Sequence, residues 1–385
     1  MNTLAFHGGK SFEAIGEDFQ NLDRAAHVIN ADVLDAWFDP SPRVLSKLQQ
    51  YLPFLVRTSP PAYSSGLVAA IARVRGIPTD CILTGGGSSD LIFTCLPRLN
   101  SRIQTVMILD PMYGEYRHVI ETVLGAQTVS FMLHKEEDFR IDTDRLIASV
   151  QRHHPDLLVF VNPNSPTGQY WPRREVFRLL DATPASTWIL IDETYIEYAG
   201  REESLEAEAC KRDRLIVLKS MSKTYALSGM RVGYLVAGPS TISLLARWVP
   251  PWAVSLPAQI AAVEALGDED YYGGKYCETH SLREDLVHQL RHNPQITTYP
   301  STTNFVLVET RTSAQDTLEE MRKSDVFVRN CDSMGERFAD RFIRIAVKRR
   351  VDNSRIVDAL FRATNDRKTE DSRLTTSPDA CVTQR

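Results

Sequence analysis

Short apolar runs alternate with helical patterns through the middle of the chain, and this alternation restricts the fold more than any other feature. The runs are nearly continuous in Val, Ile and Leu, which is typical of strands that helices cover on both faces. They occupy residues 81–84, 105–110, 157–161, 188–192, 215–218 and 232–237, with helical patterns over 88–97, 116–123, 174–180 and 240–248. We therefore expect an α/β fold with a large, mostly parallel sheet.

The pattern changes after Pro257. A long helical segment follows over residues 268–292, and its amphipathic spacing suits a helix that links two domains. Next come a strand over 304–309, a helix over 314–323, strands over 326–329 and 342–347, and a helix over 353–362. Strands and helices in this order predict a smaller α+β domain.

The chain has 385 residues, more than the roughly 100–250 of one ordinary domain. The patterns divide it into four parts: an N-terminal arm with a substrate loop over 1–45, a large sheet domain over 46–260, a small C-terminal domain over 261–365 and a tail over 366–385. The tail is polar and aperiodic, so we expect it to be disordered.

Composition excludes several classes of protein. Hydrophobic residues make up 43% and the net charge is −5, so we expect neither a disordered chain nor a nucleic-acid or anionic-membrane partner. The sequence contains no apolar run near the length of about 20 residues that a membrane helix needs, and its first residues do not resemble a secretory signal. Six scattered cysteines without a CxxC pair predict no metal site and a reducing, cytoplasmic location.

The most informative segment is KSMSKTYALSGMRVGY, residues 219–234. Lys223 follows an apolar run and lies close to Ser220 and Ser222, and Arg231 comes eight positions later in a glycine-flanked turn. Hydroxyls and an arginine can hold a phosphate, and a lysine can form a Schiff base with an aldehyde. A single lysine after a strand is usually a solvated charge. The SxSK…R spacing favours the catalytic interpretation.

Three other segments carry candidate residues. Asp192 ends the run of WILIDETYIEY, where it either pairs with a pyridinium nitrogen or caps a helix. Ser88 and Ser89 in GGGSSD form an anion site at a helix start or a plain turn. Tyr113 in DPMYGEY either stacks on a flat ring or belongs to the core.

Two arginines and a serine complete the candidates. Arg329 and Arg344 end or interrupt short apolar runs, where an arginine needs a partner. That partner is either a substrate carboxylate or an internal acid. Ser165 lies in the loop NPNSPTG, and the sequence of this loop by itself predicts no more than a strand-to-helix turn.

In order and spacing these segments resemble fold-type I pyridoxal-phosphate enzymes of the class I and II aminotransferase family, over residues 7–364. The similarity is close to the histidinol-phosphate aminotransferase branch, which includes threonine-phosphate decarboxylases. The resemblance implies a seven-stranded-type sheet domain, a smaller α+β domain and pyridoxal 5'-phosphate as cofactor. It also implies an amino acid substrate, a keto acid if the enzyme is a transaminase, and a homodimer with shared active sites.

The resemblance also implies a role for each candidate. Lys223 would form the internal aldimine and later move the α-proton, while Asp192 would pair with the pyridine nitrogen. Tyr195 would bond to the ring hydroxyl and Tyr113 would stack on the ring. The remaining roles are phosphate or cofactor binding for Ser88, Ser89, Ser220, Ser222 and Arg231, and substrate binding for Arg344, which clamps the α-carboxylate, and for Arg329.

The sequence departs from the family at three places. Ser165 stands where the family has an asparagine that bonds to the ring hydroxyl. Tyr63, in RTSPPAYSSG, is the candidate for a tyrosine that reaches the partner subunit's phosphate. The usual Asn-Pro-Gly loop is replaced by INADVLDAWFDPSP, which brings Asp35 and Trp37 towards the substrate.

Acidic residues in that loop, Asp32, Asp35 and Asp39, favour a cationic or neutral amino acid over a phosphorylated one. The start of the chain gives a different indication. His7 opens an HGG sequence that resembles threonine-phosphate decarboxylases, in which this histidine faces the substrate phosphate. A flexible terminal turn is the plain alternative.

The reaction itself stays open at this point. We expect an aminotransferase, because most of the family are aminotransferases. The alternatives are a decarboxylase and an enzyme that eliminates or cyclises a β- or γ-substituted amino acid. A non-catalytic binding protein of the same fold is a further alternative, although the intact Lys223, Asp192 and Arg231 argue against it.

Overall fold

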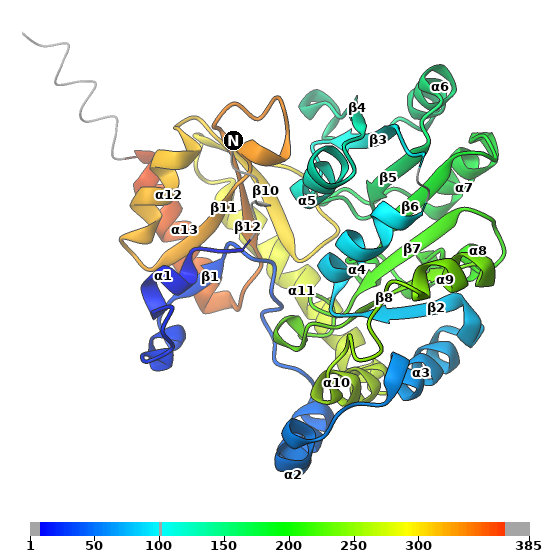
Figure 1. The fold of residues 1–385 in the computed structure, drawn as a ribbon. Coiled ribbons are helices and arrows are strands. Elements are labelled where there is room, and N and C mark those ends of the chain that lie inside the picture. Colours follow the sequence, from blue (N-terminus) through cyan, green and yellow to red (C-terminus); the bar gives the residue numbers. More distant parts are fainter. Residues whose placement is uncertain (1–7, 100–101, 366–385) are drawn as a thin grey trace, which may run out of the picture.

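The computed structural model describes residues 8–99 and 102–365, whose strands form two sheets (Figure 1). His7 and the predicted tail over 366–385 lie outside the described residues. Within those residues, the larger sheet and its helices fill one side of the molecule in Figure 1, and the smaller sheet fills the other.

The larger sheet has seven strands in the order β2-β8-β7-β6-β5-β3-β4. Neighbouring strands are parallel except at β8, which is antiparallel to both β2 and β7. The strands are β2 (Ile82–Gly85), β3 (Thr105–Asp110), β4 (Gln127–Met132), β5 (Leu157–Val161), β6 (Trp188–Asp192), β7 (Leu215–Ser220) and β8 (Gly233–Ala237). The predicted α/β fold with a large, mostly parallel sheet is confirmed.

Strand direction brings the loops of this sheet together. Strands β3, β5, β6 and β7 are parallel, so their carboxyl ends lie at one edge of the sheet. Strand β2 runs in the same direction, because β8 separates it from β7 and is antiparallel to both. Ligands of open α/β sheets bind at this edge.

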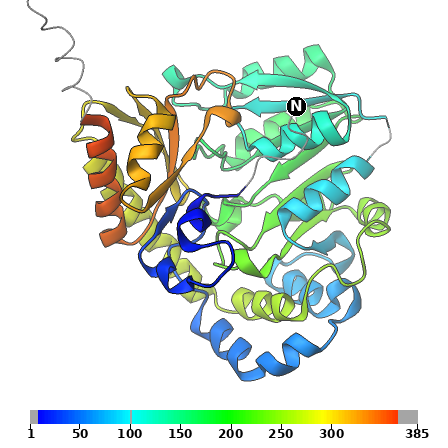
Figure 2. The ribbon, with the colours of Figure 1, turned by 60° about the vertical axis from the view of Figure 1, so that its left-hand side comes forward.

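Helices lie along the larger sheet and beside it (Figures 1 and 2). Those that follow its strands are α4 (Ser88–Cys95), α5 (Gly114–His118), α6 (Thr143–His153), α7 (Arg173–Ala182), α8 (Glu206–Ala209) and α9 (Pro239–Ala246). The helix predicted over 116–123 begins earlier, and it continues after α5 as a π-helical turn, Val119–Val123. A separate group packs together near the sheet: α2 (Pro42–Arg57), α3 (Ser65–Arg75) and α10 (Leu256–Leu266).

The smaller sheet has five strands in the order β1-β11-β12-β10-β9. They are β1 (Ile29–Ala31), β9 (Ile296–Thr298), β10 (Phe305–Thr310), β11 (Val326–Asn330) and β12 (Phe342–Ala346). Strand β1 pairs in parallel with β11, and the other neighbours are antiparallel. The N-terminal segment therefore forms an edge of this sheet, after the short helix α1 (Ser11–Ile15).

Three helices accompany the smaller sheet: α11 (Glu269–Leu290), α12 (Ala314–Arg322) and α13 (Arg350–Asn365). Helix α11 corresponds to the long helix predicted over 268–292, and Figure 1 shows it between the two sheets. None of the helices within the described residues has both the length and the apolar character that crossing a bilayer requires.

A cluster of buried charges joins α3 to the larger sheet. Arg75 Nη2 lies 2.7 Å from Glu197 Oε1, and Lys219 Nζ lies 2.9 Å from the same oxygen. Glu193 Oε2 lies 3.5 Å from Lys219 Nζ, and the hydroxyl of Tyr234 donates to Glu206 Oε1. Because buried charges are tolerated only when paired, this cluster fixes α3 and the loop after β6 against β7.

Candidate active site

A pocket opens at the carboxyl edge of the larger sheet and extends to strands β11 and β12 of the smaller one. Its lining includes most of the residues that the sequence analysis selected: Ser88, Ser89, Tyr113, Ser165, Asp192, Tyr195, Ser220, Ser222, Lys223, Arg231, Arg329 and Arg344. The chain thus brings together side chains from loops that are far apart in the sequence. Val33 and Leu34 add apolar surface to the same pocket.

Lys223 follows β7 and pairs with a carboxylate from the N-terminal segment. Its Nζ lies 2.9 Å from Asp35 Oδ1 and 3.5 Å from Ser228 Oγ. Burial lowers the pKa of Lys223, as do the positive charges of Arg344 and Arg231, and Asp35 only partly opposes this effect. A lowered pKa increases the fraction of neutral amine, which is the nucleophilic form.

The partner of Lys223 is itself held by several groups. Burial acts to raise the pKa of Asp35, but attraction to Lys223 and hydrogen bonds from Ser228 and Lys223 outweigh it and lower the pKa. Lys348, whose pKa burial lowers to about 8, donates to the main-chain oxygen of Asp35 at 3.1 Å. Asp35 therefore remains an anion between two lysines.

Asp192 ends β6 and is buried at the base of the pocket. Its Oδ1 accepts hydrogen bonds from the main-chain N–H and the hydroxyl of Thr194, and its Oδ2 accepts one from Tyr116 at 2.8 Å. Burial raises the pKa of Asp192, although the bonds from Thr194 and Tyr116 act in the opposite direction. Such a carboxylate suits a partner that carries a proton on a ring nitrogen.

Arg231 and the start of α4 form a cradle of donors. Arg231 has a left-handed backbone (φ 54°), and its Nη1 donates to the main-chain oxygen of Ser228. At Gly87 (φ +99°) a Cβ would lie 2.7 Å from Arg231 Nη2, and at Gly233 it would lie 3.0 Å from the Ser88 nitrogen. Both glycines therefore keep this end of the pocket open for an anion at the helix N-terminus.

A buried acid stands beside this cradle. Glu115 accepts a hydrogen bond at 2.6 Å from the hydroxyl of Ser89 and one at 2.7 Å from the hydroxyl of Tyr113. Burial, together with Glu115, raises the pKa of Tyr113 well above its usual value. The ring of Tyr113 packs edge-to-face against Tyr116, with centroids 6.1 Å apart.

Arg344, on β12, faces the pocket from the smaller sheet. Its Nη1 donates to Ser165 Oγ at 2.9 Å, and its guanidinium lies over the ring of Phe305. Tyr195 packs edge-to-face on the same Phe305 ring and is buried. Ser165, in place of the family's asparagine, thus orients the arginine that could bind a carboxylate.

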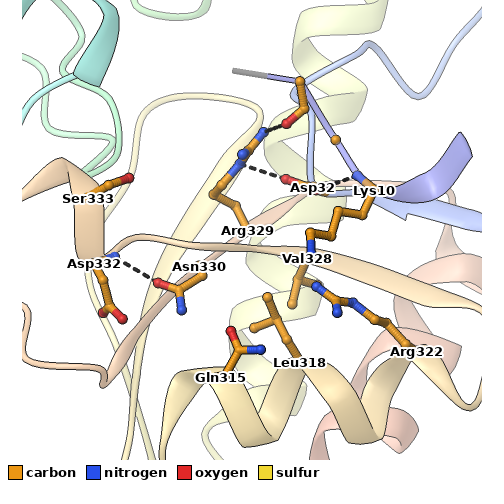
Figure 3. A pocket seen from close by; sticks show the side chains of 12 residues that line it. Lys10, Asp32, Gln315, Leu318, Arg322, Val328, Arg329, Asn330, Asp332 and Ser333 are labelled. Atoms are coloured by element: carbon orange, nitrogen blue, oxygen red, sulfur yellow. Dashed lines mark hydrogen bonds and ion pairs between the residues drawn. The ribbon is translucent and has the colours of Figure 1, made fainter. Parts of the chain in front are cut away.

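Arg329, on β11, is the second arginine of the pocket, and it is paired with Asp32. Its Nε lies 2.6 Å from Asp32 Oδ1, and its Nη2 donates to the main-chain oxygen of Gly8. Figure 3 shows this pair from a neighbouring pocket that Arg329 also lines.

Two of the predicted site residues, Trp37 and Tyr63, lie outside the lining of this pocket, and a third, His7, lies outside the described residues. Trp37 does not line the pocket; its indole N–H donates to Thr279 on α11 at 2.8 Å, and Lys275 lies over its ring. Tyr63 is exposed and lines a separate groove beside Pro251. His7 precedes the described residues, so its position stays a prediction.

Sequence reasoning also missed residues that complete the site. Tyr116, Thr194, Glu115 and Lys348 contact the selected residues, although none was selected. The sequence spacing could have indicated two of these residues. Tyr116 follows Tyr113 by one helical turn, and Thr194 follows Asp192 at the spacing of a local hydrogen-bonded turn. Lys348 depends on contacts across the fold, which no local pattern shows.

The donor groups of the pocket fit pyridoxal 5'-phosphate. The lining of the pocket supplies hydroxyls and Arg231 for a phosphate, Asp192 for a ring nitrogen and Lys223 for an aldehyde. The fold and the site together define a pyridoxal-phosphate enzyme of fold-type I. A family model described as aminotransferase class I and II matches residues 37–360, and the chain belongs to this family.

Individual relatives are distant. The histidinol-phosphate aminotransferase of Methanococcus aeolicus is 26% identical over 94% of this chain and 96% of its own. A putative threonine-phosphate decarboxylase of Caldanaerobacter subterraneus is 29% identical over 76% of this chain and 80% of its own. The histidinol-phosphate aminotransferase of Sinorhizobium meliloti, solved in complex with pyridoxal-5'-phosphate, aligns with a TM-score of 0.81 at 24% identity, covering 94% of this chain and 96% of its own. The chain is similar to each, and the predicted resemblance is confirmed.

Proposed function

We propose that the protein is a pyridoxal-phosphate-dependent aminotransferase that moves the amino group of an α-amino acid to a keto acid. The observation that carries this proposal is one pocket that holds an amine with a lowered pKa, Lys223, a buried carboxylate, Asp192, and a buried guanidinium, Arg344. These groups match the three requirements of the reaction: an amine for the cofactor and the α-proton, a partner for the ring and a clamp for the substrate carboxylate.

Pyridoxal phosphate supplies an aldehyde that condenses with amines and a ring that draws electrons from the bonds at the α-carbon. Arg231, Ser88 and Ser222 would hold its phosphate, because they converge beside the N-terminus of α4. Asp192 would keep a proton on the ring nitrogen, and Thr194 and Tyr116 fix the direction of its carboxylate.

Lys223 would accept the α-proton at its Nζ. Burial favours the neutral amine that this step requires. Asp35, 2.9 Å away, is close enough to stabilise the ammonium that forms when Nζ takes the proton.

Arg344 would orient the substrate. Its guanidinium is buried, so a carboxylate would meet it away from bulk water, where a charge-assisted bond is strong. Ser165 and Phe305 hold the guanidinium on two sides. The position of the carboxylate in turn decides which bond of the α-carbon faces Lys223.

We further propose that two copies pair across the face of α2. Leu45, Leu52 and Val56 share one side of this helix, and Val56 is 73% exposed. Tyr63 follows α2 and is 58% exposed, and its main-chain N–H donates to the main-chain oxygen of Pro251, the residue before the exposed Trp252. Exposed apolar surface of this kind marks an interface. In such a dimer Tyr63 would reach towards the phosphate of the other subunit.

The enzyme would work in the cytoplasm. Cys81, Cys95, Cys210, Cys277 and Cys331 form no disulfide among the described residues. Free thiols on the surface and in the core suit a reducing compartment.

The test is a single turnover of the cofactor-loaded enzyme with a panel of amino acids and without any keto acid. A transaminase releases one equivalent of keto acid per bound cofactor, and the yellow colour fades because the amino group stays on the cofactor. Carbon dioxide with the colour retained would instead identify a decarboxylase, and ammonia an eliminating enzyme. In Lys223→Ala the rate of keto acid release should fall by on the order of 10²–10⁴-fold.

Decarboxylation is the second candidate. It is favoured by the similarity to the putative threonine-phosphate decarboxylase of Caldanaerobacter subterraneus and by the contact between Arg329 and Gly8, the first glycine of the HGG sequence. The carbon dioxide measurement described above decides between the two reactions.

A further inference from the structure

The two arginines of the pocket have different surroundings. Arg329 and Arg344 are register partners on β11 and β12, and both are buried. Arg344 contacts a hydroxyl, a main-chain carbonyl and an aromatic ring. Arg329 instead forms an ion pair with Asp32, at 2.6 Å. One guanidinium thus faces neutral groups of the chain, while the charge of the other is balanced by a carboxylate.

The carboxylate of Asp32 is built firmly into this position. Asp32 is 5% exposed, and its Oδ2 accepts a hydrogen bond from the main-chain N–H of Lys10 at 3.1 Å (Figure 3). Its main-chain oxygen accepts a bond from Arg344 Nη2 at 3.2 Å. A Cβ on Gly9 would lie 3.2 Å from Asp32 Oδ2, so the N-terminal segment packs closely over the pair. Separating a buried ion pair of this kind is strongly unfavourable.

We propose that Asp32 determines substrate specificity by excluding amino acids that carry a second anionic group. The enzyme then acts on α-amino acids with uncharged side chains. The inference rests on the proposed function in one respect, that Arg344 binds the α-carboxylate. A distal carboxylate or phosphate would need Arg329 as its counter-ion, and it would meet the negative charge of Asp32 at the same guanidinium. The apolar Val33 and Leu34, which also line the pocket, suit an uncharged side chain.

The other two acids of this loop have different contacts. Asp35 pairs with Lys223, and Asp39 is exposed. The main-chain oxygen of Asp39 accepts a bond from Tyr271, and Asp39 lines neither this pocket nor the neighbouring one, which Asp32 lines together with Arg329. Asp32 is therefore the acid that opposes a distal anion. Because Asp32 and Asp35 are both paired with basic side chains, neither is left to bind a cationic substrate, and the expected substrate is a neutral one.

Two ligands of nearly equal shape test the proposal: glutarate, a dicarboxylate, and glutaramate, its half-amide. Their dissociation constants are measured by titration calorimetry with the full-length, cofactor-loaded enzyme. We expect the wild-type protein to bind glutaramate about tenfold or more tightly than glutarate, because the second carboxylate lacks a free counter-ion.

Asp32→Asn removes the charge and keeps an oxygen that can accept from the Lys10 N–H. In this variant Arg329 loses its carboxylate, so the ratio of the two dissociation constants should shift by about tenfold or more in favour of glutarate. Asp39→Asn changes an exposed acid of the same loop, and it should leave the ratio within about twofold of wild type, as expected for a screened surface charge.

A purely structural role for Asp32 predicts a different result. If Asp32 only anchors the N-terminal segment, Asp32→Asn would weaken the binding of both ligands equally. An unchanged ratio of the two dissociation constants therefore overturns the proposal. A wild-type protein that binds glutarate as tightly as glutaramate overturns it as well. If Asp32→Asn does not fold, Asp32→Asn/Arg329→Gln removes both charges together. This double variant should keep the preference for glutaramate, and a preference for glutarate would contradict the proposal.

The binding measurement does not depend on turnover. A protein that releases no keto acid from any amino acid would disprove the proposed transamination, while the ligand ratio would still test Asp32. If the enzyme does turn over, the same preference should appear as faster single-turnover release of keto acid from L-glutamine than from L-glutamate. Asp32→Asn should then reduce that difference.

Discussion

Lys223 Nζ and Asp35 Oδ1 lie 2.9 Å apart, although 188 positions separate the two residues in the sequence. The contact joins the loop after β7 of the larger sheet to the N-terminal segment that packs with the smaller sheet. It therefore couples the reactivity of the lysine to a loop whose Val33 and Leu34 line the same pocket. A second lysine, Lys348, donates to the main-chain oxygen of Asp35 at 3.1 Å.

We predict that Asp35→Asn shifts cofactor incorporation to lower pH. Lys223 must be neutral to attack the aldehyde, and burial with Arg344 and Arg231 already lowers its pKa, while Asp35 raises it. Without this carboxylate the pKa of Lys223 falls further. The rate of yellow colour formation, measured against pH after mixing apoprotein with pyridoxal phosphate, should reach half its maximum at a lower pH. Asp39→Asn is the matched control. An unchanged or higher midpoint in Asp35→Asn would contradict this prediction.

The stability of the protein should depend on pH through Glu193. Burial raises the pKa of Glu193 from 4.5 to about 7, with Glu206 adding to the effect and Lys219 opposing it. A raised pKa means that the folded state binds the proton more tightly, so the contribution of Glu193 is complete below pH 4.5 and is lost as the pH rises through about 7.

We therefore predict that the free energy of unfolding of wild type, relative to Glu193→Gln, falls by up to about 3 kcal/mol between acidic and neutral pH. Urea unfolding of both proteins across this range measures the difference. The exposed Glu202 provides a control, because Glu202→Gln should leave the pH profile of wild type unchanged. A difference between wild type and Glu193→Gln that is constant with pH would refute the assignment.

Much of the fold could be predicted from the sequence, because its strands are buried on both faces. The run at β5 is apolar throughout, the run at β6 is apolar up to its last residue, Asp192, and both strands have the predicted bounds. Strand β4 was missed because its residues are half-buried and mix polar with apolar side chains. Strand β1 has three residues, and its place in the smaller sheet comes from pairing with β11, not from a pattern of its own.

The site residues likewise divide into those that the sequence reveals and those that it does not. Residues next to strand ends were found from sequence, because the carboxyl edge of a parallel sheet collects them. Partners that depend on packing were not found: Glu115 was missed beside Ser89, and the pairing of Asp32 with Arg329 needed the smaller sheet to be assembled. Trp37 shows the opposite error, since its loop lies near the pocket while its indole turns to α11.

A charge on α2 should separate the proposed dimer. Val56 is 73% exposed on the apolar side of α2, and Val351 is 72% exposed on α13 of the smaller domain. We expect Val56→Asp to weaken self-association by roughly 30-fold or more, because a charge would be buried in the interface. Val351→Asp introduces the same charge on another surface and should leave the dimer intact. Analytical ultracentrifugation over a range of concentrations measures both, and equal association of Val56→Asp and wild type would argue against this face.

Substitution of Arg75 should lower the free energy of unfolding more than most single substitutions do. Its side chain is 2% exposed and lies 2.7 Å from Glu197 and 3.6 Å from Glu206. Arg75→Met leaves buried carboxylates with one counter-ion fewer, and breaking such a pair costs about 3–5 kcal/mol.

Arg178 is a suitable comparison, because it also contacts two acids, Glu175 and Asp144, but at the surface. Arg178→Met should change the free energy of unfolding little, since water and salt screen exposed pairs. Adding Glu197→Gln to Arg75→Met should recover part of the lost stability, because it removes one of the carboxylates that Arg75 leaves behind. Urea unfolding of the variants at neutral pH measures each change. Similar losses in Arg75→Met and Arg178→Met would show that burial of the cluster does not set its energetic importance.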